Sequence, residues 1–117
     1  MTSALFSPIE LRGLTLKNRI AVSPMCEYSS VDGFVNEWHL VHLGSRAVGG
    51  AGLVFVEATA VLPQARISPQ DVGIWSDAHV APHARLAAAI AAVGSVPGIQ
   101  IAHAGRKASR NPAWLHG

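Results

Sequence analysis

The sequence is poor in charged residues and in cysteine. Only 14% of its 117 residues are charged, and it contains one cysteine. A single cysteine excludes an internal disulfide, and a net charge of +2 is too small to indicate a nucleic-acid partner. The sequence also lacks a signal peptide, a lipidation motif and an apolar run of about 18 residues. We therefore expect a soluble cytoplasmic protein with no membrane and no nucleic-acid partner.

Half of all residues are apolar, and they are arranged in short segments. This composition is typical of an interior-rich globular protein. Apolar periodicity and turn residues predict a small hairpin followed by alternating strands and helices. The hairpin covers residues 5–16, the strands 19–23, 53–58 and 98–103, and the helices 38–48 and 76–93, with a long loop at 62–75. This order predicts an α/β fold with a parallel sheet and right-handed crossovers.

The number of predicted elements limits what this chain can build. Three parallel strands and two helices cannot cover both faces of a sheet, and they cannot close a barrel. A complete (β/α)8 barrel needs about 250 residues. We therefore expect the chain to be the first part of something larger.

Chemistry in parallel α/β folds lies at the carboxyl ends of the strands. Three segments of this sequence follow predicted strands. They are Ser23–Tyr28, Glu57–Ala60, and Gln100 with His103–Lys107. We expect a binding site where these segments meet.

Cys26 and Tyr28, the only residues of their kinds in the chain, each allow more than one interpretation. A lone cysteine is most simply a small buried apolar residue, but just past a strand end its thiol can also tune a ligand through a weak hydrogen bond. A nucleophilic role, as in a cysteine hydrolase, is a weaker alternative because no histidine can be assigned as its base. Tyr28 is either an amphipathic rim residue or a hydrogen-bond donor to a substrate carbonyl.

The remaining polar candidates are Gln100 and two histidine pairs. Gln100 alternates with isoleucines in an apolar strand, and a buried amide there needs either a heterocyclic ligand or a structural network as its partner. His39 and His42, and likewise His79 and His83, are spaced like metal ligands on a helix. Neither pair has a third ligand in register, so we expect no metal site.

Four segments together resemble the Old Yellow Enzyme family, and more narrowly its bacterial thermophilic-like branch with the xenobiotic reductases. They are LKNRIAVSPMCEYSS, EWHLVHLGSRAVGGAGLVFVEATAV, ARISPQDVGIWSD and GIQIAHAGRKAS, and the match runs from about Leu5 to Ser109. The resemblance implies that residues 1–117 are the N-terminal segment of a single FMN-binding TIM (β/α)8 barrel domain. The segment would hold the first three strands and two helices, preceded by the hairpin.

The resemblance also implies an activity, that of an FMN-dependent ene-reductase. In that family NADPH reduces FMN, which then reduces an alkene conjugated to a carbonyl or nitro group. The residues that bind the substrate carbonyl, supply the proton and hold the FMN phosphate belong to later parts of the barrel. We therefore expect another chain to supply the remaining barrel, and the assembled enzyme to be a homo-oligomer.

Individual positions match the motifs of that family. Cys26 matches the cysteine that adjusts the flavin potential and substrate binding, and Tyr28 matches a substrate-binding tyrosine, so these two are the catalytic candidates. Glu27, between them, is charged where the pattern predicts a neutral residue. The resemblance implies that the cofactor-binding residues are Ser23, Pro24, Met25, Cys26, Ala58 and Gln100.

Two alternatives stay open at this point. The chain can be an inactive fragment that exposes apolar strand edges and acts only as a structural or association piece. It can also belong to another FMN-dependent barrel oxidoreductase. The combination of the SPMCEY, EATAV and HAGRK motifs disfavours the second alternative.

Overall fold

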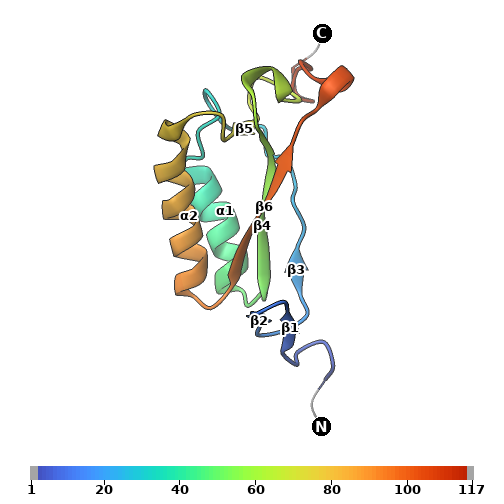
Figure 1. Cartoon of the computed structure of the whole chain (residues 1–117), viewed down its shortest axis with the longest axis vertical. Helices are drawn as coiled ribbons and strands as arrows, with labels where there is room; N and C mark the ends of the chain where they lie inside the picture. The colour runs from blue at the N-terminus through green and yellow to red at the C-terminus, as the bar shows by residue number, and fades with distance from the viewer. Residues whose placement is uncertain (1–2, 116–117) are drawn as a thin grey trace.

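Strands and helices alternate along the chain behind a short hairpin (Figure 1). The computed structural model describes residues 3–115, so the first two and last two positions of the predicted 1–117 segment lie outside the described residues. The elements are β1 (Ile9–Leu11), β2 (Leu14–Leu16), β3 (Ala21–Val22), α1 (Glu37–Val48), β4 (Leu53–Ala60), β5 (Val72–Gly73), α2 (Val80–Ala92) and β6 (Val96–Ala102). The predicted order of strands and helices is confirmed except for β5, which was not predicted.

Strand β4 is the centre of a parallel sheet. β3 pairs with the beginning of β4, with Ala21 opposite Leu53, and β6 pairs with β4 as far as Ala60 opposite Ala102. Strand β5 pairs with the end of β4, on the edge that the two-residue β3 leaves open. The sequence prediction placed β5 inside a loop. Two residues are too few to show the alternation that identifies a strand.

Both helices lie on one face of the sheet (Figure 1). Between them and the sheet lies the core, in which Val54 and Ile90 are fully buried. Phe55, which alternates with Val54 along β4, is only half-buried. Within the described residues, no second layer covers the face opposite the helices, in agreement with the expectation that these elements cannot cover both faces of a sheet.

The ends of both helices are fixed by local side chains. Asn36 caps α1: its Oδ1 accepts a hydrogen bond from Trp38 N at 3.0 Å, and its own N–H donates to His39 Nδ1 at 3.0 Å. The second helix was predicted to start directly after Ser76. In the structure a 3-10 turn, Asp77–His79, comes first, and α2 follows with Pro82 in its first turn, where the missing N–H of proline is tolerated.

Candidate functional site

The carboxyl ends of β3, β4 and β6 meet at one edge of the sheet, because all three strands run parallel. The segment Ser23–Tyr28 follows β3. Ala58 lies near the end of β4, and Gln100 near the end of β6. The three segments that the sequence analysis selected therefore lie at the edge where ligands bind in parallel α/β folds.

Cys26 is half-buried and has two close neighbours at this edge. The backbone of Ala58 and the side chain of Tyr28 both lie near its thiol. Burial raises the pKa of the Cys26 thiol above its ordinary value, and the negative charges of Asp71 and Glu57 raise it further. Because the thiolate is the nucleophilic form, a raised pKa argues against the cysteine-hydrolase alternative.

Tyr28 is held in an uncommon backbone conformation, with φ of 50°. Its ring makes an edge-to-face contact with Trp114, with 6.0 Å between the ring centroids. Burial, followed by the charge of Cys26, raises the pKa of the Tyr28 phenol. The phenol therefore keeps its proton and is available as a hydrogen-bond donor.

Ala58 and Gln100 line the same cavity, which has a volume of about 260 Å³. The expectation that Gln100 is a buried amide is wrong: its side chain is exposed on the uncovered face of the sheet. No hydrogen bond of the Gln100 side chain occurs among residues 3–115. The other residues lining the cavity are Ala60, Ala65, Ile67, Asp71, Ile101, Ala102, His103 and Ala104.

Two glutamates of this site were not assigned a role from the sequence. Glu57 is only 4% exposed, and its Oε2 accepts a hydrogen bond from the Glu27 N–H at 3.1 Å. Glu27 in turn accepts a hydrogen bond from Trp38 Nε1 at 3.3 Å and lies 3.6 Å from His42 Nε2. The signal that was available for Glu57 is a carboxylate inside the apolar run LVFVEATA, since buried carboxylates need partners.

The paired histidines make structural contacts. His79 donates from Nε2 to the Asp32 carbonyl at 2.9 Å, and His83 donates from Nε2 to the Gly73 carbonyl at 3.1 Å. His39 Nδ1 accepts a hydrogen bond from the N–H of Asn36, the N-cap of α1, and His42 lies beside Glu27. Within residues 3–115, no group of three or more His, Cys, Asp or Glu side chains is placed to hold a metal ion.

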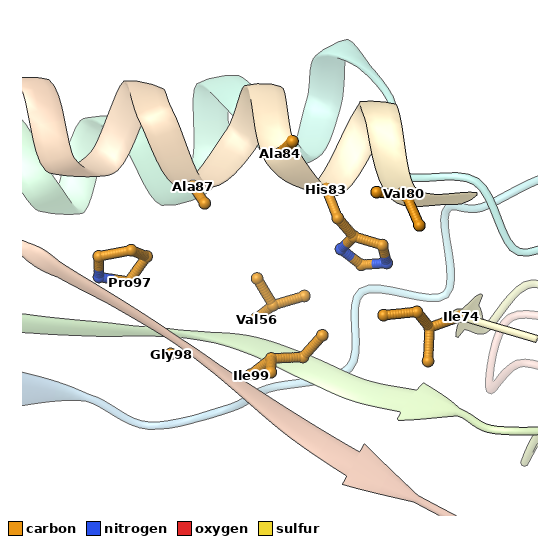
Figure 2. A pocket seen from close by; sticks show the side chains of 9 residues that line it. All are labelled: Val56, Ile74, Val80, His83, Ala84, Ala87, Pro97, Gly98 and Ile99. Atoms are coloured by element: carbon orange, nitrogen blue, oxygen red, sulfur yellow. The ribbon is translucent and has the colours of Figure 1, made fainter. Parts of the chain in front are cut away.

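A second cavity, of about 340 Å³, lies between α2 and the sheet (Figure 2). Its walls are almost entirely apolar, and burial lowers the pKa of its one ionisable side chain, His83. It is on the helix side of the sheet, with no convergent polar groups, so we assign it to packing. Its lining residues are Val56, Ile74, Val80, His83, Ala84, Ala87, Pro97, Gly98 and Ile99.

Arg106 and Lys107, in the segment that follows β6, lie in an exposed 3-10 turn, Gly105–Lys107. Among the described residues, no helix has the length and apolar character needed to cross a membrane.

Known proteins resemble this chain in sequence over most of its length. Residues 4–113 match the model of the NADH:flavin oxidoreductase / NADH oxidase family. The chain is 59% identical to the NADPH dehydrogenase of Bacillus licheniformis over 106 residues, which are 89% of this chain and 31% of that protein. It is 54% identical to the NADPH dehydrogenase of Bacillus subtilis over 110 residues, 92% of this chain and 32% of that protein. The chain thus spans about a third of the length of these relatives.

Solved structures give the same assignment. Morphinone reductase superposes with a TM-score of 0.83 at 33% identity, covering 90% of this chain and 28% of the reductase. The old yellow enzyme from Trypanosoma cruzi superposes with a TM-score of 0.83 at 30% identity, again over 90% of this chain and 28% of that enzyme. The chain therefore belongs to the NADH:flavin oxidoreductase / NADH oxidase family, which includes the Old Yellow Enzymes, and folds as the N-terminal portion of their (β/α)8 barrel.

Proposed function

We propose that this chain forms one flank of the FMN site of an NADPH-dependent ene-reductase. The observation that carries the proposal is the convergence of Cys26, Tyr28, Ala58 and Gln100 at the carboxyl edge of the sheet. The substrates would be small activated alkenes, in which the double bond is conjugated to a carbonyl or nitro group. The names of the NADPH dehydrogenases that share more than half of the aligned residues support NADPH as the reductant.

The residues at this edge fit a flavin ring. Ala58 and Ala60 are small and leave an open cavity, which a flat ring needs. The Gln100 amide offers a donor and an acceptor without an internal partner, matching the alternating polar atoms of a pyrimidine edge. Ser23, Pro24 and Met25 lie in the same segment as Cys26, and Ser23 and Met25 are exposed, so they are free to pack along the ring.

Each side chain would have a distinct task. Bound FMN supplies hydride transfer, from NADPH to the flavin and then to the β carbon of the alkene. The neutral Cys26 thiol would adjust the flavin through a weak hydrogen bond, and the Tyr28 phenol would contact the substrate. The Gln100 side chain would donate to the ring edge on which negative charge develops, an interaction that favours the reduced ring.

The proposal includes the remainder of the barrel. Residues 1–117 would be the N-terminal segment of a single FMN-binding (β/α)8 domain. Further strands, in another chain or in a longer polypeptide, would bind the FMN phosphate and the substrate carbonyl. We propose that the assembled enzyme is a cytoplasmic homo-oligomer.

A visible absorption spectrum of the purified protein, combined with intact mass, tests this function. A flavin band together with more polypeptide mass than this chain supplies, and NADPH-dependent reduction of a conjugated enone, is the expected result. The absence of a flavin band would support the inactive-fragment alternative. A flavin band without enone reduction would instead support another FMN-dependent oxidoreductase.

A further inference from the structure

Strand β4 holds the segment after β3 at two consecutive positions. The backbone of Ala58 lies beside the Cys26 thiol, and the Glu57 carboxylate accepts a hydrogen bond from the Glu27 N–H at 3.1 Å. Neighbouring residues of the strand therefore hold neighbouring residues of the segment. These two contacts fix the position of Cys26 relative to the carboxyl end of β4.

Glu57 is an unusual residue for this position. It is 4% exposed, and its Oε1 has no hydrogen-bond partner in the described structure. The nearest possible cation is His39 Nε2, at 3.8 Å. The Asn36 N–H donates to His39 Nδ1, so a ring proton lies on Nε2, which is 3.5 Å from Ser30 Oγ as well as near Glu57.

Burying a carboxylate costs free energy unless it is fully paired, and this one is only partly paired. An apolar residue of similar size would suit the interior of β4 better for stability. Among the described residues, the hydrogen bond from the Glu27 N–H is the one that the Glu57 carboxylate accepts, and an apolar residue cannot replace it. This contact therefore indicates a role connected with the segment and not with the core.

Helix α1 also contacts Glu27. The Glu27 carboxylate accepts a hydrogen bond from Trp38 Nε1 and lies near His42 Nε2. Residue 27 is thus fixed through its main chain by β4 and through its side chain by α1. Cys26 and Tyr28 flank it, and Tyr28 keeps a positive φ that a loosely held residue would avoid.

We propose that Glu57 is a positioning residue, which through the Glu27 amide orients the Cys26 thiol toward the flavin and the Tyr28 phenol toward the substrate. This role rests on the proposed function. For this role the Glu57 side chain needs the length that lets it accept the hydrogen bond from the Glu27 amide, and it does not need the negative charge.

Two substitutions in the flavin-loaded enzyme separate reach from charge. Glu57→Asp keeps the charge but shortens the side chain by one methylene, which breaks the contact with Glu27. Glu57→Gln keeps the reach and a carbonyl acceptor but removes the charge. Glu10→Asp, at an exposed position of β1, is the matched control.

The measurement is the alkylation rate of Cys26 by iodoacetamide, followed by peptide mass mapping, at the high-pH limit where the thiol is fully ionised. At this limit the rate reports the accessibility of the sulfur and not its pKa. We expect Glu57→Asp to raise this rate about threefold to tenfold, the factor expected for one lost hydrogen bond, and to raise KM for the enone more than it lowers kcat. Glu57→Gln and the control should stay within about twofold of the parent enzyme, below the effect of one hydrogen bond.

Three other outcomes overturn the proposal. An equal or larger effect of Glu57→Gln would assign the role to charge. No change in either variant would leave Glu57 without a positioning role, and failure of both variants to fold or load flavin would make it purely structural. Alkylation of Cys26 does not depend on alkene reduction. If Glu57→Asp is alkylated faster than Glu57→Gln and the control but the enzyme reduces no enone, the proposed function is contradicted. The positioning contact between Glu57 and Glu27 is then still supported.

Discussion

The indole nitrogen of Trp38 lies 3.3 Å from Oε1 of Glu27. The imidazole of His42 stacks on the same indole, with 5.6 Å between the ring centroids, and its Nε2 is 3.6 Å from the same oxygen. The carboxylate of Glu27 is therefore engaged by α1. This explains how the chain accommodates a charge at a position where the family pattern predicts a neutral residue.

The first prediction concerns this charge. Glu27→Gln keeps an acceptor for the Trp38 indole, so KM for the enone should stay within about twofold of the parent value, less than the effect of one hydrogen bond. Loss of the partly buried contact with His42 should lower the free energy of unfolding by about 1 kcal/mol or less. Steady-state kinetics and thermal unfolding check the two values. A tenfold rise in KM would instead place the Glu27 carboxylate in the substrate pocket.

The second prediction concerns the ionisation of Cys26. Burial and the charge of Asp71 raise the pKa of the thiol, so its alkylation rate should reach half of its maximum at a higher pH than a free cysteine does. Asp71→Asn should shift this midpoint to lower pH. Asp77→Asn, an exposed change, is the control. A midpoint that Asp71→Asn does not move would show that Asp71 has no influence on the thiol.

The raised pKa of Cys26 also has a consequence for stability. The folded state holds the thiol proton more tightly than the unfolded state does. The associated stability is therefore fully present below the pKa of the unfolded thiol and is lost as pH rises toward the folded pKa. Cys26→Ala should remove this alkaline loss, and urea unfolding at a series of pH values measures it. An alkaline loss of the same size in the variant would assign it to other groups.

Much of the fold could be predicted because the apolar pattern is strong where the elements are long. The run Leu53–Ala58 and the alanine-rich segment before Gly94 each identified their element. Prediction failed at β5, where pairing to the end of β4 creates a strand of two residues. Prediction also failed for Gln100, which was expected to be buried but is exposed. Its apolar neighbours in the sequence do not show whether anything packs against its face of the sheet.

The site could be located from the strand ends, but its internal contacts could not be predicted. The resemblance selected Cys26 and Tyr28, and the structure brings their side chains together with the backbone of Ala58. The bond from the Glu27 amide to Glu57 joins residues that are 30 positions apart. It depends on the register between the segment after β3 and β4, which no local pattern determines.

The third prediction tests Cys26 as a tuner of the flavin. Cys26→Ala should leave FMN bound and shift its two-electron potential by roughly 10–30 mV, the equivalent of one weak hydrogen bond. Equilibrium reduction with a reference dye measures the potential, and the absorption spectrum measures the bound flavin. Loss of FMN from a folded variant would contradict the tuning role, because it would make the thiol part of the binding contacts.

The fourth prediction concerns Gln100, whose exposed amide lines the cavity beside Ala58. If the amide binds the ring edge, Gln100→Leu removes hydrogen bonds to a group that gains negative charge, and FMN affinity should fall about tenfold to a hundredfold. The potential should fall as well, because the reduced ring loses more stabilisation than the oxidised ring. Gln64→Leu, at an exposed position in the 3-10 turn Pro63–Ala65, is the matched control. Fluorescence titration of the apoprotein with FMN measures the affinity. Equal affinities for the two variants would show that the amide does not contact the flavin, and the cavity beside Ala58 would then need another occupant.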